Sequence, residues 1–290
     1  MAPKWTQKPI KNILLDINGV LYESGEEHAI EGSVDAMKRL VEHGFEFCLV
    51  TNECTTPKRL LTEKLNAFGF DMITSDRIVS PAPTACEYII QRGLRPRLHV
   101  WNDILEDFQP ALDRLRESGA GEQPANCLVI GDVMSQLSRD FVDESLEIML
   151  KCPEKPQIIS LGAGRYYKDA GRLRLDTGAF AKAFAYALDI DEITCLGKPS
   201  AEFFGQALNV LSAKTTSNQK PPTYENTIMI GDDVVSDVGG AQAMGMRGFL
   251  VRTGKYKPSD ETDRGVIPDD VFDNLYEATD KIISQVSHVV

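Results

Sequence analysis

The sequence is poor in histidine, and its cysteines are widely spaced, which excludes the common histidine and cysteine metal motifs. The four histidines form no H-x₃-H pair, and the six cysteines form no C-x-x-C pair. A zinc ribbon and a thioredoxin motif are therefore excluded. We expect reduced thiols, several of them buried as small apolar side chains.

Positive charge and long apolar runs are also scarce. There are 31 Lys and Arg against 43 Asp and Glu, a net charge of −12, which argues against binding to nucleic acid or to an anionic membrane surface. No run of about 18 apolar residues predicts a transmembrane helix. The first twelve residues, MAPKWTQKPIKN, lack the apolar core of a signal peptide. We expect a cytoplasmic protein, and a nuclear location stays open.

Strand-like and helix-like segments alternate in the first and last thirds of the 290-residue chain. This alternation predicts an α/β fold with a doubly wound, Rossmann-like parallel sheet. The expected strands are 12–16, 45–51, 226–230 and 247–251, and the expected helices are 33–43, 57–68, 200–211, 235–244 and 275–286.

The middle of the chain is predicted to be a separate α/β domain. It has strand-like runs at 97–101, 126–131 and 156–162. Their ends lack the pronounced acidic tips that follow strand-like runs in the first and last thirds of the chain. We predict a core of residues 1–81 and 193–290 with an inserted domain of residues 82–192. The polar segment 212–226 contains Pro-Pro and is predicted to be an exposed loop.

Two apolar runs end abruptly in carboxylates: ILLD ends at Asp16, and TIMIGDD ends at Asp232 and Asp233. A carboxylate at a strand end can attack phosphorus, so Asp16 is the candidate nucleophile. Asp16 and Asp232, with the carbonyl of Asn18, are candidate ligands for Mg²⁺, which prefers oxygen. Asp233 and Asp237 are candidate supporting acids. The alternative is that the acids of 231–237 only cap a helix.

Three further polar residues follow predicted strands. Thr51 and Asn52 end the run CLVT, where a hydroxyl and backbone N–H groups suit a phosphoryl oxygen, although an ordinary N-cap is the simpler reading. Lys198, in LGKPS, is placed to neutralise the charge of nucleophile and phosphoryl group. The alternative for Lys198 is a solvated surface lysine.

The order of these motifs resembles the haloacid dehalogenase superfamily of phosphatases. The motifs are D-x-N-G-V at 16, T-N at 51, G-K-P-S at 197 and G-D-D-x-x-x-D at 231. The insertion resembles the α/β (C2-type) cap of the branch that includes the pyridoxal phosphate and phosphoglycolate phosphatases. A closer likeness within the superfamily is carried by segments such as LLDINGVLYESG, ISLGAGRYYKDAGRLRLDTGAF and VRTGKYKPSD.

The resemblance implies the same site roles for these residues and adds expectations for the cap. Asp16 is then nucleophile and Mg²⁺ ligand, Asn18 lends its carbonyl, Thr51 and Lys198 bind the phosphoryl group, and Asp232 completes the metal site. The cap is expected to select the substrate through residues between 165 and 176, which no motif assigns individually. A homodimer formed through the cap is expected by analogy.

Asn18 departs from the superfamily pattern, in which most phosphatases have a second Asp at this position as general acid and base. An amide cannot deliver a proton, and such help is worth about 10²–10⁴-fold. Substrates with good leaving groups suffer less, which favours pyrophosphate and the P–N bonds of phosphohistidine and phospholysine. The branch of the superfamily that carries the closer likeness is associated with P–O–P and P–N bonds of this kind. An engineered amide, introduced to trap a substrate, would look the same in the sequence.

The leading hypothesis is a Mg²⁺-dependent phosphohydrolase that forms an aspartyl-phosphate. Its partner is a phosphorylated small molecule or a phosphorylated Lys or His side chain. One alternative is a phosphatase for small metabolites such as phosphoglycolate or pyridoxal phosphate. Another is a feeble pseudo-phosphatase that binds phosphorylated ligands without turning them over.

Overall fold

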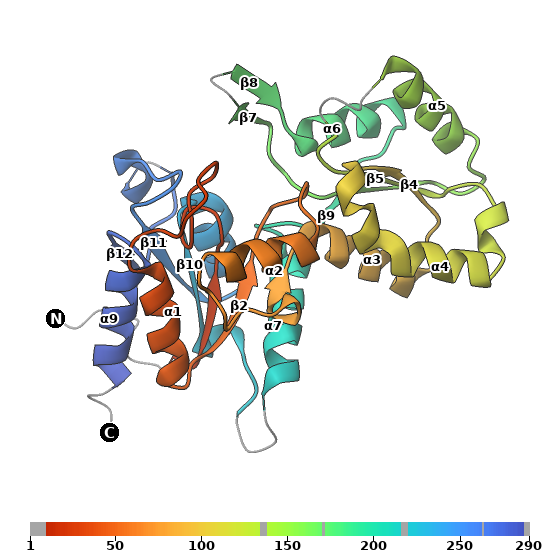
Figure 1. Ribbon diagram of the computed structural model, residues 1–290. Coiled ribbons are helices and arrows are strands. Elements are labelled where there is room, and N and C mark those ends of the chain that lie inside the picture. The colour runs from red at the N-terminus through yellow and green to blue at the C-terminus, as the bar shows by residue number, and fades with distance from the viewer. Residues whose placement is uncertain (1–9, 134–137, 170–171, 216–219, 263, 287–290) are drawn as a thin grey trace. The chain divides into compact units, whose positions relative to one another are not determined.

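The computed structural model describes residues 10–133, 138–169, 172–215, 220–262 and 264–286 (Figure 1). The chain divides into two compact units. The first unit contains the chain up to Thr51, then Leu61–Val79, then the chain from Lys198 onward. The second unit contains Asn52–Leu60 and Ser80–Gly197.

A parallel sheet forms the centre of the first unit. Its six described strands have the order β12-β11-β10-β1-β2-β3. The strands are β1 (Asn12–Leu15), β2 (Glu46–Val50), β3 (Ile78–Val79), β10 (Thr227–Gly231), β11 (Arg247–Val251) and β12 (Asp270–Phe272). The helices are α1 (Ser33–Glu42), α2 (Lys58–Ala67), α7 (Ala201–Lys214), α8 (Gly240–Ala243) and α9 (Leu275–Val286). The predicted parallel α/β core is confirmed.

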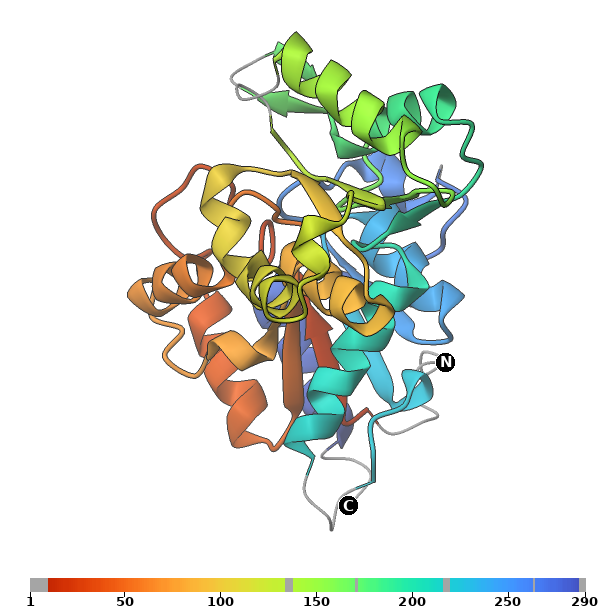
Figure 2. The ribbon, with the colours of Figure 1, turned by 90° about the vertical axis from the view of Figure 1, so that its right-hand side faces the viewer.

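Both faces of this sheet are buried, as expected for a parallel sheet with crossover helices. On β1, Ile13 and Leu15 pack into a cluster with residues of α1, α2 and α9, whereas Leu14 packs into a cluster with α7 and α8. β10 repeats this alternation, with Ile228 and Ile230 on the first face and Met229 on the second. In the turned view of Figure 2, α7 runs along the second face.

The second unit has its own parallel sheet, with the strand order β4-β5-β6-β9. Cys127 and Val129 of β5 face a cluster that includes α3, and Leu128 and Ile130 face a cluster that includes α5 and α6. A separate antiparallel hairpin pairs β7 with β8. The strands are β4 (Pro96–His99), β5 (Cys127–Ile130), β6 (Gln157–Ser160), β7 (Tyr166–Asp169), β8 (Arg172–Leu175) and β9 (Ile193–Cys195). The helices are α3 (Pro81–Arg92), α4 (Gln109–Glu117), α5 (Arg139–Leu150) and α6 (Thr177–Ala187).

The boundaries of the units differ from the predicted 1–81, 82–192 and 193–290. Residues 193–197 belong to the second unit because β9 pairs with β6, with Ile193 opposite Ile158. The second unit also includes Asn52–Leu60, the segment that ends in the first turn of α2. Short strands at a domain boundary carry no sequence signal for the sheet that they join.

Two other predicted segments need correction. The predicted loop 212–226 begins inside α7, because polar side chains near its end bond to carbonyls one turn back: Ser212 to Leu208 and Thr215 to Leu211. Residues 216–219 lie outside the described part. The predicted helix 235–244 is a π-helix over Val234–Gly239 followed by the short α8.

The helices of the described residues include none that is long and apolar enough to cross a membrane. None of the six cysteines forms a disulfide, and three of them are buried, as predicted: Cys48, Cys86 and Cys127.

Candidate active site

Polar side chains follow three neighbouring strands of the first sheet. Asp16 follows β1, Asp232 follows β10 and Thr51 follows β2. β1 lies between β2 and β10 and is parallel to both, so the three strand ends meet at one edge. The N–H of Asp16 donates to the carbonyl of Ile230 at 2.9 Å, which extends the pairing to the nucleophile candidate. This is the edge at which parallel sheets bind ligands.

Lys198 joins two of the acids. Its ammonium lies 2.7 Å from an oxygen of Asp16 and 2.7 Å from an oxygen of Asp237, and it donates to the carbonyl of Val50 at 3.0 Å. Its side chain is only 2% exposed. Burial lowers the pKa of Lys198, but the charges of Asp16 and Asp237 raise it by more, so its pKa lies above the ordinary value. Lys198 is therefore a buried cation, and the solvated alternative is wrong.

Asp237 lies beneath the end of β10, and its position explains the spacing of the G-D-D-x-x-x-D motif. A Cβ at Gly231 would lie 2.1 Å from Oδ2 of Asp237, so only glycine leaves room for this carboxylate. The N–H of Asp233 donates to Asp237 at 3.1 Å. Burial and the charge of Asp16 raise the pKa of Asp237 well above its usual value. Asp237 thus helps to hold Lys198 in place through their ion pair of 2.7 Å.

Asp232 is enclosed by two glycines and a backbone amide. A Cβ at Gly19 would lie 2.3 Å from its Oδ2, and one at Gly254 would lie 2.1 Å from the same atom. The N–H of Lys255 donates to this oxygen at 2.6 Å. Both glycines also have φ in the left-handed region, at 83° and 62°. The loops after β1 and β11 therefore pack closely against the carboxylate of Asp232.

The three buried acids fit a divalent cation. Oxygens of Asp16, Asp232 and Asp237 all lie within 4.8 Å of one another. Within the described residues, Oδ1 of Asp232 is buried and accepts no hydrogen bond. Carboxylate oxygens are the ligands that Mg²⁺ prefers, and one or two of them suffice. Lys198 pairs with both Asp16 and Asp237, whereas Asp232 has no ion-pair partner among the described residues and is the clearest candidate ligand. The predicted sharing of Mg²⁺ by Asp16 and Asp232 stays a prediction.

The Asp232 site predicts a pH dependence of metal binding. Burial and the charge of Asp16 raise the pKa of Asp232 to about 7. A proton then competes with a cation, so we expect the affinity for Mg²⁺ to rise with pH up to about 7, by as much as about tenfold per pH unit. Calorimetric titration with Mg²⁺ over a pH series measures this, and an affinity independent of pH would contradict it.

The raised pKa of Asp232 also affects the free energy of unfolding of protein stripped of divalent cations. The folded carboxyl of Asp232 holds a proton up to about pH 7, whereas the unfolded one loses it near 3.8. The folded state binds more protons between these values, so the contribution of Asp232 to stability falls as pH rises through this window. Asn at position 232 should remove this component, which urea unfolding over the same pH series measures.

The other predicted site residues have mixed outcomes. Asp233 is the N-cap of the π-helix, because its carboxylate accepts the N–H groups of Val235 and Ser236. The capping alternative is therefore confirmed for Asp233, and its role near a metal stays a prediction. Asn18 is half-buried and bridges to Tyr22 through its backbone.

Thr51 and Asn52 fall on opposite sides of a unit boundary. Thr51 is buried, and its N–H donates to the carbonyl of Val79, so this particular N–H is already used within the sheet. Phosphoryl binding by its hydroxyl stays a prediction. The side chain of Asn52 lies in the second unit, where a Cβ at Gly197 would be 2.9 Å from its Oδ1. Phosphoryl binding by Asn52 stays a prediction.

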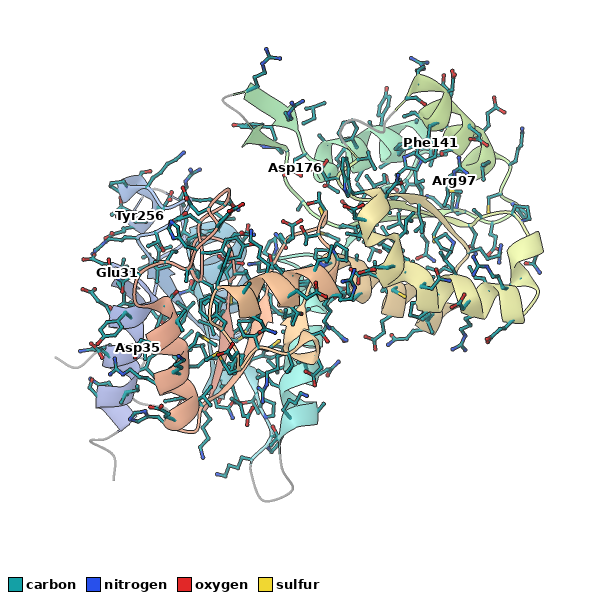
Figure 3. All side chains as sticks on the ribbon, in the orientation of Figure 1. Glu31, Asp35, Arg97, Phe141, Asp176 and Tyr256 are labelled. Atoms are coloured by element: carbon teal, nitrogen blue, oxygen red, sulfur yellow. The ribbon has the colours of Figure 1, made fainter. Side chains whose placement is uncertain are left out.

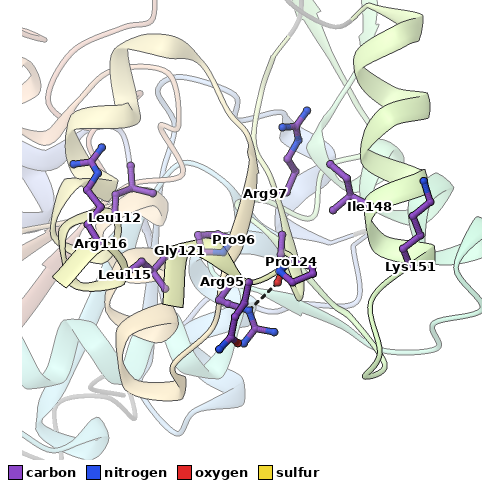
Figure 4. A pocket seen from close by; sticks show the side chains of 12 residues that line it. Arg95, Pro96, Arg97, Leu112, Leu115, Arg116, Gly121, Pro124, Ile148 and Lys151 are labelled. Carbon is purple, nitrogen blue, oxygen red and sulfur yellow. Dashed lines mark hydrogen bonds between the residues drawn. The ribbon is translucent and has the colours of Figure 1, made fainter. Parts of the chain in front are cut away.

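A pocket in the second unit is a different feature from this acid cluster. Figure 4 shows that Pro96 and Arg97, at the start of β4, line it together with Leu112 and Leu115. It thus lies at the amino ends of strands, the edge that parallel sheets rarely use for ligands. Its cations are already paired: Arg95 with Glu154, Arg97 with Glu144, Arg116 with Asp113 and Lys151 with Glu147. The acid cluster of the first unit is the stronger candidate.

Sequence reasoning missed the loop after β11, which contains Thr253, Gly254 and Lys255. The Gly-Lys pair lacks the spacing of a phosphate-binding P-loop, so that motif does not mark it. The available signal is the apolar run RGFLV, a strand adjacent to β10 that is followed by Arg-Thr-Gly-Lys.

The fold and the site together define a class. The parallel α/β unit places acids at adjacent strand ends, with a buried lysine between two of them. This arrangement is suited to metal-assisted hydrolysis.

Comparison with known proteins identifies the family within that class. Residues 13–115 match the model of the haloacid dehalogenase-like hydrolase family, and residues 195–278 match a second, HAD-hydrolase-like model. The phospholysine phosphohistidine inorganic pyrophosphate phosphatase of Danio rerio is 41% identical over 279 residues, covering 96% of each chain. Its namesake of Homo sapiens is 39% identical over 287 residues, covering 98% of each chain.

Solved structures are similar in fold. The p-nitrophenyl phosphatase of Archaeoglobus fulgidus superposes with a TM-score of 0.79 at 22% identity, covering 94% of this chain and all of that one. The 4-nitrophenylphosphatase of Thermotoga maritima gives 0.78 at 22% identity, covering 94% and 97%. The chain belongs to the haloacid dehalogenase-like hydrolase family, and the predicted family membership is confirmed.

Proposed function

We propose that this protein is a Mg²⁺-dependent phosphohydrolase whose preferred substrates are inorganic pyrophosphate and the P–N bonds of phosphohistidine and phospholysine. One observation carries the phosphohydrolase proposal: Lys198 joins Asp16 to Asp237 at 2.7 Å each, and Asp232 lies close enough to share a cation with Asp16. The substrate preference is supported by Asn18 and by the names of the relatives that match nearly the whole chain.

The chain's own groups are suited to a two-step transfer. A carboxylate oxygen of Asp16 forms a bond to phosphorus while the bond to the leaving group breaks, which gives an aspartyl-phosphate. Water then attacks this phosphorus and regenerates the carboxylate. Lys198 holds Asp16 in position and offsets the negative charge that gathers around it. Asp16 and Asp232 would hold the cation, which lowers the repulsion between nucleophile and phosphoryl group.

The leaving group explains why Asn18 is compatible with turnover. Pyrophosphate releases phosphate, and phosphohistidine releases imidazole, whose conjugate acid has a pKa of about 6.5. Neither leaving group needs a strong general acid. An alkyl phosphate releases an alkoxide and does need one, so the amide of Asn18 penalises it.

Asn18→Asp is therefore expected to raise kcat/KM for phosphoglycolate by at least about tenfold, because it restores a general acid and base at that position. The same change should alter pyrophosphate turnover much less. Steady-state kinetics with both substrates measures this. An unchanged rate with phosphoglycolate, in a protein in which Asp16→Asn is inactive, would show that position 18 does not provide the missing proton transfer.

A substrate panel run with and without Mg²⁺ tests the function directly. We expect phosphate release from pyrophosphate, phosphohistidine and phospholysine, and little from phosphoglycolate or pyridoxal phosphate. The reverse order would favour the small-metabolite alternative. Tight binding without turnover of any of them would favour the pseudo-phosphatase. Dimer formation through the second unit and a cytoplasmic location stay predictions.

A further inference from the structure

Lys255 lies beside the acid cluster on a loop that the site itself holds in place. Its N–H donates to Asp232 at 2.6 Å. The preceding residues are fixed as well: the hydroxyl of Thr253 donates to the carbonyl of Gly19, and the N–H of Gly254 donates to Glu23 at 3.0 Å. Figure 3 shows the next residue, Tyr256, on this loop of the first unit. The backbone of Lys255 is therefore anchored at the edge of the site.

Unlike Lys198 and Arg252, Lys255 has no ion-pair partner among the described residues. Lys198 is paired with Asp16 and Asp237, and Arg252 is paired with two other carboxylates, Glu261 and Asp273. In the part of the chain that the structure describes, no carboxylate lies within ion-pair distance of Lys255. Much of the surface of this residue is exposed, although neighbouring atoms exclude part of the water from its ammonium.

The field of the acid cluster nevertheless reaches Lys255. Loss of water around the ammonium lowers its pKa, whereas the carboxylates raise it by more, with Asp16 and Asp232 the largest contributors. The net effect is a pKa above the ordinary value. Lys255 is thus a charged group whose backbone contacts the cluster and whose ammonium is influenced by several of its acids, but it forms no ion pair with any described one of them.

The formal charges of the site indicate which kind of group the ammonium of Lys255 can bind. Asp16, Asp232, Asp237 and Lys198 carry three negative charges and one positive charge, a formal total of −2. A divalent cation brings this to zero. One phosphoryl group then adds about −1.5 to −2. A second phosphate, in the leaving group, adds further negative charge. Lys198 cannot offset this charge because its own charge is already balanced by Asp16 and Asp237.

We propose that Lys255 binds the leaving phosphate of substrates that contain two phosphoryl groups, and so favours pyrophosphate over singly phosphorylated compounds. This proposal rests on the proposed phosphohydrolase function. Lys255 acts here in substrate selection, whereas Asp16 and Lys198 serve the phosphoryl group common to all substrates.

Lys255→Gln tests this in the full-length protein. We expect KM for pyrophosphate to rise about tenfold, the change typical of one lost charge-assisted hydrogen bond, with kcat within about threefold. KM for p-nitrophenyl phosphate should change less than about threefold. Lys255→Arg should keep most of the pyrophosphate affinity. The matched control is Lys38→Gln, which removes the same charge from the exposed face of α1 and should alter neither substrate.

A binding measurement separates this proposal from the proposed function. Calorimetric titration of the Mg²⁺-loaded protein with imidodiphosphate, which resists cleavage, should show about tenfold weaker binding in Lys255→Gln, while inorganic phosphate binds equally. If the unaltered protein binds imidodiphosphate but does not cleave pyrophosphate, the proposed function fails and the Lys255 comparison still stands. Equal effects on imidodiphosphate and phosphate, no effect on either, or no binding of imidodiphosphate by the unaltered protein would overturn the Lys255 proposal.

Discussion

Replacing Asp16 by asparagine is expected to lower phosphate release from pyrophosphate by a factor on the order of 10⁴ or more, the scale of nucleophile loss in other hydrolases. An amide has the same shape but cannot form the bond to phosphorus. The measurement is phosphate release at saturating Mg²⁺, combined with acid quenching after exposure to radiolabelled pyrophosphate. Label bound covalently to the protein should be present in the unaltered chain and absent in Asp16→Asn.

The fold of this variant should survive. Asp16 is one of three buried carboxylates within 4.8 Å, so removing its charge relieves repulsion, and Lys198 keeps Asp237 as a partner. We expect an unchanged or raised thermal midpoint. Asp35→Asn is the matched control, since this acid lies on the exposed face of α1 and should cost little activity. Residual turnover of Asp16→Asn above about one per cent, with label still bound, would exclude Asp16 as the nucleophile.

Lys198→Met is expected to lower both stability and activity. It leaves Asp16 and Asp237 buried with no cation between them, and breaking a buried pair in this way costs about 3–5 kcal/mol. Activity should fall by about 10²–10³-fold because the positive charge near the nucleophile is lost. Urea unfolding of protein stripped of divalent cations measures the first effect, and steady-state pyrophosphate hydrolysis measures the second.

A second substitution separates these two effects. Adding Asp237→Asn to Lys198→Met removes one of the uncompensated charges and should recover part of the stability without recovering activity. Lys38→Met, on an exposed helix face, controls for the loss of a lysine and should change the urea midpoint very little. A Lys198→Met protein as stable as the unaltered one would mean that Lys198 does not stabilise the buried acids.

The acids and the lysine could be predicted from the sequence because strand ends leave a strong pattern. An apolar run that stops at an acid marks Asp16 and Asp232, and parallel topology then brings neighbouring strand ends to one edge. Lys198 needed the resemblance as well, since Gly-Lys-Pro alone does not distinguish a buried lysine from a solvated one. The ion pairs with Asp16 and Asp237 decide that question.

The role of Asp237 and the loop of Lys255 could not be derived in the same way. That Asp237 lies under Gly231 depends on the π-helix, whose extra residue per turn is not visible in an apolar pattern. Lys255 reaches Asp232 through its backbone N–H, a contact that carries no side-chain signature. The unit boundary at β9 was missed because three residues are too few to show periodicity.

The division of labour within the chain has an evolutionary consequence. Asp16, Asp232, Asp237, Lys198 and Lys255 all belong to the same compact unit, although 146 residues separate Thr51 from Lys198 in the numbering of the chain. The candidate residues for bond cleavage therefore lie together in the first unit. The second unit, Asn52–Leu60 and Ser80–Gly197, can diverge without rebuilding these strand ends, whereas Leu61–Val79 belongs to the first unit and supplies β3 of its sheet.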